Sequence, residues 1–122
     1  IWETAMFASH HDLSRFVVIV DRNKLCIVGE TEKYVGLNPL REKWQSFGWE
    51  TWEIEGHNFG EIEKTLVEID NSTSKKPKAI ISNSIKGKGI SIMEGMPLWH
   101  NKIPNDDECK QIEKELGVGN GK

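Results

Sequence analysis

Hydrophobic residues recur along the chain with the spacings of alternating helices and strands. Residues 15–20 form a nearly continuous apolar, β-branched run, which is typical of a strand buried on both faces. Two shorter strands are predicted, at residues 49–54 and 79–81. Helical spacing predicts helices at residues 1–13, from Asn38-Pro39, after His57 or Asn58, and from Asn105. The alternating order predicts an α/β fold, a parallel sheet with helices on both faces.

Each predicted helix has an apolar face. The second helix has Leu40, Trp44 and Phe47 on this face. The third helix has Phe59, Ile62, Leu66 and Ile69. The last helix begins with a capping-box pattern, an Asn followed three residues later by Glu. No capping residue precedes Ile1, so we expect this sequence to begin inside a helix of a longer protein.

Length, charge and apolar content limit the classes of protein to which the chain can belong. Its 122 residues are enough for one domain, predicted at 1–116, followed by a glycine-rich tail or linker at 117–122. With 16 basic and 19 acidic residues, the net charge of −3 argues against a nucleic-acid partner. The longest apolar run is too short to cross a membrane. Two cysteines suit a reducing compartment, so we expect a cytoplasmic protein.

Polar segments follow the three predicted strands, at residues 21–25, 55–58 and 83–89. In parallel sheets, ligands bind beyond the carboxyl ends of the strands. Two of these segments contain glycine, which lets the backbone approach a ligand closely. The pattern therefore predicts a site for an anionic small molecule. The Lys-Gly-Lys-Gly stretch at 86–89 lacks the spacing of a P-loop or of a dinucleotide-binding loop.

The sequence neighbours of one histidine suggest anion binding. His100 follows Trp99 and precedes Lys102 in a predicted loop. A solitary loop histidine is more often an ordinary surface residue, and both interpretations stay open on these residues alone. No Cys or His spacing in the chain fits a zinc site.

Three segments together resemble a known family. They are IWETAMFASHHDLSRFVVIVDRNKLCIVGETE, LREKWQSFGWETWEIEGHN and IKGKGISIMEGMPLWHNKIPNDDE. In this order they resemble the N-terminal, thiamine-diphosphate-binding part of transketolase, and the N-terminal subunit of split transketolases. The resemblance implies transfer of a two-carbon ketol unit from a ketose phosphate to an aldose phosphate, in the pentose phosphate pathway. It also implies a partner, either a pyrimidine-binding domain or a C-terminal subunit, in a homodimer or heterotetramer.

The resemblance assigns the cofactor and metal ligands. Asn23 matches the asparagine that closes the family's metal motif, and Leu25 matches the position whose backbone carbonyl is a further ligand. The metal implied is Mg²⁺ or Ca²⁺, and it holds the diphosphate of thiamine diphosphate. An oxygen-only donor set suits such hard cations. Lys86 matches a position near the cofactor.

The resemblance also implies three residues close to the reaction. His100 matches a histidine between cofactor and substrate, with a catalytic role and contacts to both. Lys102 is expected to help hold the substrate, and Glu3 matches a catalytic acidic residue at the subunit interface behind the cofactor.

Part of the family pattern does not occur in these residues. The Gly-Asp-Gly that opens the metal motif is absent from the sequence, so we expect the chain by itself to be inactive. Two alternatives remain. One is another thiamine-diphosphate enzyme such as deoxyxylulose-phosphate synthase, although these generally lack the Trp-His pair. The other is a non-catalytic binding or assembly module, with some of the five tryptophans at its interface.

Overall fold

The computed structural model describes residues 1–118 and divides into two compact units. The first, here called the sheet unit, consists of Ile1–Asn23 and Leu37–Ser84. The second, here called the loop–helix unit, consists of Lys24–Gly36 and the chain from Ile85 onward. Each unit is described by itself.

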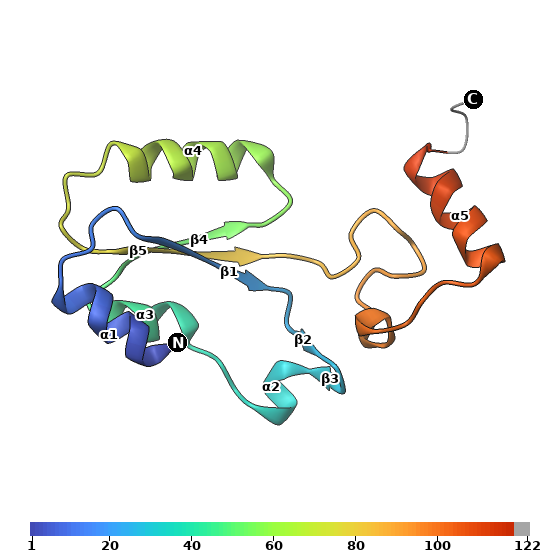
Figure 1. Ribbon diagram of the computed structural model, residues 1–122, viewed down its shortest axis with the longest axis horizontal. Coiled ribbons are helices and arrows are strands. Elements are labelled where there is room, and N and C mark those ends of the chain that lie inside the picture. Colours follow the sequence, from blue (N-terminus) through green and yellow to red (C-terminus); the bar gives the residue numbers. More distant parts are fainter. Residues whose placement is uncertain (119–122) are drawn as a thin grey trace. The chain divides into compact units, whose positions relative to one another are not determined.

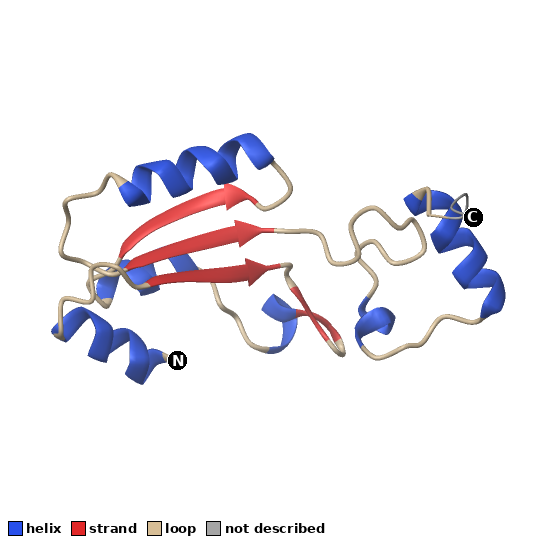
Figure 2. Cartoon of the chain, turned by 45° about the horizontal axis from the view of Figure 1, so that its top comes forward, coloured by secondary structure: helices blue, strands red, loops and turns tan. Residues whose placement is uncertain are grey.

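The sheet unit is built on three parallel strands. They lie in the order β1 (Val17–Arg22), β5 (Lys78–Asn83) and β4 (Glu50–Glu55). Helices α1 (Trp2–His10) and α3 (Leu40–Ser46) lie on one face, and α4 (Phe59–Asp70) lies on the other (Figures 1 and 2). The predicted α/β fold, with a parallel sheet and helices on both faces, is confirmed.

The core lies between the sheet and the pair α1 and α3. Trp44 and Trp49 are almost fully buried, with ring centroids 4.8 Å apart in an edge-to-face arrangement. Nε1 of Trp49 donates a hydrogen bond of 2.9 Å to the carbonyl of Ala5, which joins α1 to the strand entry. The apolar face predicted for α3 is confirmed, because Leu40 and Trp44 are buried and Phe47 packs against the same core.

The outer face of β1 is exposed in the described chain, although its apolar run is typical of a strand covered on both faces. Val18 and Val20 pack against the core, but Val17 and Ile19 are 37% and 63% exposed. In the described chain β1 is an edge strand. Its pairing with β5 uses one edge only, and α4 packs over β4. A run of apolar residues shows that both faces are suited to burial, but it does not show what covers them.

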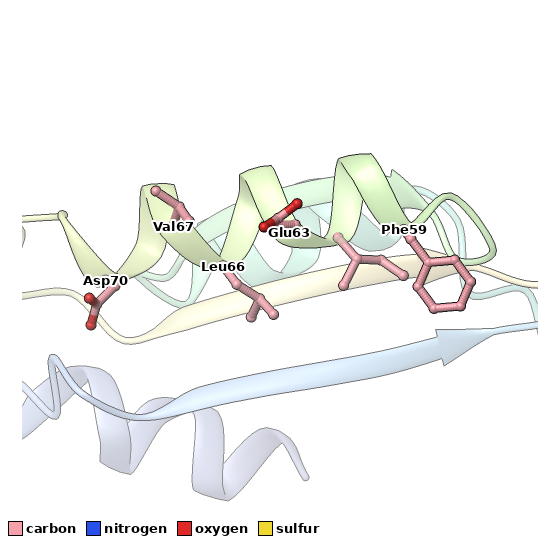
Figure 3. Close-up of a pocket in the computed structure, with 6 residues that line it drawn as sticks. Phe59, Glu63, Leu66, Val67 and Asp70 are labelled. Atoms are coloured by element: carbon pink, nitrogen blue, oxygen red, sulfur yellow. The ribbon is translucent and has the colours of Figure 1, made fainter.

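The apolar face predicted for α4 is covered only in part. Ile62 and Ile69 are half-buried, but Phe59 and Leu66 are 85% and 45% exposed. The two exposed residues help to line a groove of about 550 Å³, and Figure 3 shows them projecting from the same side of α4. The helix begins as predicted at Asn58, whose side chain accepts a hydrogen bond from the amide of Glu61.

A buried lysine connects two loops at the start of the sheet. Lys78 is only 2% exposed, and its Nζ donates to the carbonyls of Ser14 (2.7 Å) and Ser74 (3.0 Å). These hydrogen bonds offset part of the desolvation of a buried charge, since a buried ammonium without partners is strongly unfavourable. Lys78 thereby holds together the segments that lead into β1 and β5.

The loop–helix unit contains short elements and one long helix. They are β2 (Leu25–Cys26), β3 (Gly29–Glu30), α2 (Thr31–Tyr34), the 3₁₀ helix η1 (Pro97–His100) and α5 (Asp106–Leu116). The hairpin of β2 and β3, and α2, have no counterpart in the prediction. The capping box at the start of α5 is confirmed, and Gly117 ends the helix with φ +68°. Of the predicted tail, residues 119–122 lie outside the described part. No helix within residues 1–118 has the length and apolar character to cross a bilayer.

Candidate functional site

The carboxyl ends of β1 and β5 meet at one edge of the sheet unit. Asp21 at the end of β1 accepts hydrogen bonds from Oγ of Ser84 and, at 3.5 Å, from Nδ2 of Asn23. The amide of Ser84 donates to the carbonyl of Arg22 across the same two strands. The parallel register, with Arg22 opposite Asn83, brings these polar segments together. At this edge of the sheet, the side chain of Asn23 lies beside the carboxylate of Asp21.

The third strand ends at the same edge. The amide of Gly56, just after β4, donates a 2.6 Å hydrogen bond to the carbonyl of Asn83. A Cβ at Gly56 would collide with Oγ of Ser82 and lie 3.0 Å from the Asn83 carbonyl oxygen. Only glycine permits this approach, so it fixes how closely the exits of β4 and β5 converge. Nδ2 of Asn83 in turn donates to Glu53 at 2.9 Å.

The donor chemistry at Asn23 fits a hard divalent cation in part. Its amide supplies an oxygen ligand, and Asp21 beside it supplies negative charge. Leu25, the second predicted ligand, lies in β2 of the loop–helix unit and pairs with Glu30. Within residues 1–118, no group of three or more His, Cys, Asp or Glu could hold a metal ion. A cation held by Asn23 would therefore need oxygen ligands beyond those of the described residues, such as phosphate oxygens, water and the Gly-Asp-Gly half of the family's metal motif.

In the loop–helix unit, the Lys-Gly-Lys-Gly stretch forms a compact turn. Gly87 has φ +73°, and a Cβ there would lie 2.7 Å from the backbone of Met93. The carbonyl of Lys86 accepts a 2.9 Å hydrogen bond from the amide of Gly95. The neighbouring Lys88 is paired with Glu94 at 3.4 Å. Among the described residues, no carboxylate lies within ion-pair distance of Lys86, which leaves its charge available to an anion.

The two glycines of this turn provide a matched pair of variants. Gly87→Ala should open the turn, because it adds a clash with backbone to the strain of a positive φ, an effect of about 2–4 kcal/mol. Gly89→Ala should cost only about 1 kcal/mol, since Gly89 has φ +94° but no atom within 4 Å of the place that a Cβ would take. Hydrogen–deuterium exchange over residues 85–95 measures the difference. Equal exchange in the two variants would contradict the role given to Gly87.

His100 ends the 3₁₀ helix η1, and its side chain is exposed. The preceding Trp99 donates from Nε1 to the carbonyl of Ile92 at 2.6 Å. Nζ of Lys102 lies 4.2 Å from the centre of the Trp99 ring and forms an ion pair with Glu108. Lys86, His100 and Lys102 therefore all lie in the loop–helix unit, and Lys102 is already engaged by this chain's own residues.

Glu108 and Glu115, both on α5, have pKa values below the ordinary value, and Glu108 is the one next to Lys102. The hydrogen bond from Lys102 and that from the Asn105 amide hold the pKa of the Glu108 carboxyl below 4.5. A carboxyl with a lowered folded-state pKa stabilises the fold above its ordinary value, and this stabilisation is lost as the pH falls through the lowered value.

Glu3, the remaining predicted residue, lies in the first turn of α1 with its side chain 88% exposed. A hydrogen bond from its backbone amide holds its pKa below the ordinary 4.5. Within the described chain it makes no contact that suggests a catalytic role, and that role stays a prediction.

Sequence reasoning missed two contributors. Asp21 lies in a segment recognised as polar, but its contact with Ser84 depends on strand pairing across 63 residues. Glu108 was recognised only as a helix cap. Its link to Lys102 crosses Pro104 in an irregular segment, so no helical or strand period could reveal it.

Comparisons of this chain with known proteins all point to one family, whose model matches residues 1–122. The family described as "Transketolase, thiamine diphosphate binding domain" matches residues 1–122. The chain is 39% identical over 116 residues to a subunit of the apulose-4-phosphate transketolase of Phocaeicola vulgatus, covering 95% of this chain and 41% of that protein. It is 40% identical to 6-deoxy-6-sulfo-D-fructose transketolase subunit SqwG of a Clostridium species, over 95% of this chain and 42% of that protein. The chain thus spans about two fifths of the length of these relatives.

A solved structure shows the same fold. The transketolase of Campylobacter jejuni superposes with a TM-score of 0.86 at 27% sequence identity, over 95% of this chain and 18% of that one.

Proposed function

The chain belongs to the transketolase family, as part of its thiamine diphosphate binding domain, and on this premise we propose that it is the cofactor-binding portion of a two-subunit transketolase. The observation that carries the proposal is the family match over residues 1–122. Two relatives, at 39% and 38% identity, are named as subunits of an apulose-4-phosphate transketolase, which supports a separate partner chain. The partner would supply the pyrimidine-binding domain, in a dimer or heterotetramer.

The proposed reaction moves a two-carbon ketol unit from a ketose phosphate to an aldose phosphate. Thiamine diphosphate, when bound, supplies the carbanion chemistry that amino-acid side chains lack. The chain's own residues would bind thiamine diphosphate and orient it. Asn23 would give an amide oxygen to Mg²⁺ or Ca²⁺, and the Leu25 carbonyl is the further oxygen ligand that the family pattern implies. The same proposal places the enzyme in the cytoplasm, in the pentose phosphate pathway.

The loop–helix unit would supply charge and hydrogen bonds. Lys86 would attract the diphosphate, because no described carboxylate neutralises it. His100 would hydrogen-bond an oxygen of the diphosphate or of the substrate as negative charge develops there. Its exposed side chain on η1 is accessible for such a contact. Lys102 would help hold the substrate phosphate from its place above Trp99.

A donor panel tests this function in the full-length protein that carries these residues together with the Gly-Asp-Gly of the metal motif, assembled with its partner subunit, thiamine diphosphate and Mg²⁺. We expect turnover of ketose phosphates in the presence of an aldose phosphate acceptor, loss of turnover with a chelator, and recovery when Mg²⁺ is added back. The chain alone should show no turnover, because its sequence lacks the Gly-Asp-Gly half of the metal motif.

Two results would contradict the proposal. Productive use of pyruvate as donor, with no turnover of ketose phosphates, would indicate an enzyme of the deoxyxylulose-phosphate synthase type. Failure of the full-length protein and its partner to bind thiamine diphosphate at any Mg²⁺ concentration would indicate a non-catalytic binding or assembly module.

A further inference from the structure

The segment that carries His100 is fixed on both sides of the histidine. Residues 97–102, here called the 97–102 segment, run from η1 to Lys102. On one side of His100, the indole of Trp99 is hydrogen-bonded to the Ile92 carbonyl. On the other side, Lys102 lies above that same indole ring. The segment therefore turns back on itself, and the backbone of His100 lies between two side chains that contact each other.

Lys102 is in turn held by Glu108 at the start of α5. The ion pair joins Nζ of Lys102 to Oε1 of Glu108, and the two side chains are only 32% and 23% exposed. A partly sheltered pair is less screened by solvent and salt than an exposed one. The neighbouring pair on the same helix, Lys110 with Asp107, is 74% and 93% exposed and so is expected to contribute little.

The two carboxylate oxygens of Glu108 have separate partners. Oε2 accepts a 2.9 Å hydrogen bond from the amide of Asn105 and completes the capping box of α5. Oε1 receives Lys102. The helix start is also fixed from the other direction, because Oδ1 of Asn105 accepts from the amides of Asp107 and Glu108. Glu108 thus connects a well-anchored helix terminus to the 97–102 segment.

A second contact ties the same helix to the upstream loop. The amide and Oγ of Ser91 donate to the two carboxylate oxygens of Glu115, each at 2.6 Å. Nε2 of Gln111 donates to Oγ of Ser91 and to Oε1 of Glu115. Because α5 is held at Ser91 as well, its first turn offers a fixed support against which Lys102 can be placed.

From this arrangement we propose that Glu108 is a positioning residue, which fixes His100 for the reaction through its ion pair with Lys102. The inference rests on the proposed function, since it requires that His100 take part in turnover. Glu108 itself needs no contact with cofactor or substrate. It acts by restricting the 97–102 segment to one conformation, so that His100 does not have to be ordered during each turnover.

The test uses Glu108→Gln, because glutamine at this position of a capping box still accepts the hydrogen bond from the helix-cap amide. The variant therefore removes the charge that holds Lys102 and keeps the helix start. Asp107→Asn is the matched control. It removes the same charge one residue away, from an ion pair with Lys110 that is exposed to solvent. Both are compared in the assembled enzyme, alone and combined with His100→Ala.

We expect Glu108→Gln to lower kcat/KM about tenfold and to have no further effect once His100 is replaced. Asp107→Asn should stay close to wild type in both backgrounds. With 5-fluorotryptophan incorporated, the ¹⁹F resonance of Trp99, assigned by its loss in Trp99→Phe, should shift in Glu108→Gln and not in Asp107→Asn. A merely structural role of Glu108 would lower activity equally with and without His100.

Each contrary outcome has a distinct meaning. Wild-type kcat/KM in Glu108→Gln, or an effect that adds to that of His100→Ala, overturns the positioning role and leaves the proposed function intact. Wild-type turnover in His100→Ala overturns the role of His100, and with it the inference drawn from that role. An unshifted Trp99 resonance in Glu108→Gln overturns the proposed connection through Lys102.

Discussion

Replacing His100 by alanine in the assembled enzyme is expected to lower kcat about a hundredfold or more. A positioned histidine that donates a hydrogen bond or proton where charge develops is commonly worth this much. Stability should change little, because the His100 side chain is exposed and the segment is held through Trp99 and Lys102 instead. Steady-state kinetics with a ketose phosphate donor, together with a thermal melt, measures both quantities.

Two further histidine variants refine this prediction. His100→Asn keeps a hydrogen-bond donor but cannot titrate near neutral pH, so it should recover part of the lost kcat if hydrogen bonding is the main contribution. His10→Ala is the matched control, an exposed histidine on α1 that has no place in the proposed site. A kcat unchanged in His100→Ala would refute the catalytic role.

Replacing Asn23 by alanine is expected to weaken metal-dependent binding of thiamine diphosphate about tenfold to a hundredfold. The substitution removes the amide oxygen proposed as a metal ligand and also the amide that donates to Asp21. Isothermal titration of the assembled enzyme with thiamine diphosphate, repeated over a series of Mg²⁺ concentrations, separates the two effects. Loss of a metal ligand should raise the Mg²⁺ concentration needed for half-maximal cofactor binding.

The control for Asn23 is Asn71→Ala, at the carboxyl end of α4. Asn71 is exposed, and its Nδ2 donates only to the local carbonyl of Val67 in the described structure. It should leave both the cofactor affinity and its Mg²⁺ dependence unchanged. If Asn23→Ala lowered cofactor affinity by the same factor at every Mg²⁺ concentration, Asn23 would act on the cofactor without the metal.

Local patterns were sufficient for most of the element order. The capping box at Asn105, the N-cap at Asn58 and the stripe of Leu40, Trp44 and Phe47 depend on residues a few positions apart. Such interactions form within one or two helical turns, so sequence spacing predicts them directly. The strand–helix alternation then restricts the sheet to parallel pairing, because short connections through helices return the chain to the same end.

Long-range packing decided what local patterns could not. The outer face of β1 and part of α4 were predicted to be buried, yet Ile19 and Phe59 are 63% and 85% exposed in the described chain. Their apolar character is a local property, but burial requires a partner supplied by the rest of a tertiary structure. The hairpin of β2 and β3 was missed because its strands are only two residues long, too short for an alternating pattern to appear.

The candidate site also has features that local sequence determines and features that only long-range packing determines. The polar residues after β1, β4 and β5 could be identified from residue types, whereas the roles of Asn23 and His100 are implied by the resemblance to transketolase and stay predictions. The contacts of Asp21 with Ser84 and of Glu108 with Lys102 arise only in the folded protein. They join residues from different strand exits, or from opposite sides of an irregular segment, and no sequence period relates such positions. Side-chain chemistry is local, whereas the geometry that orients it depends on how distant segments pack.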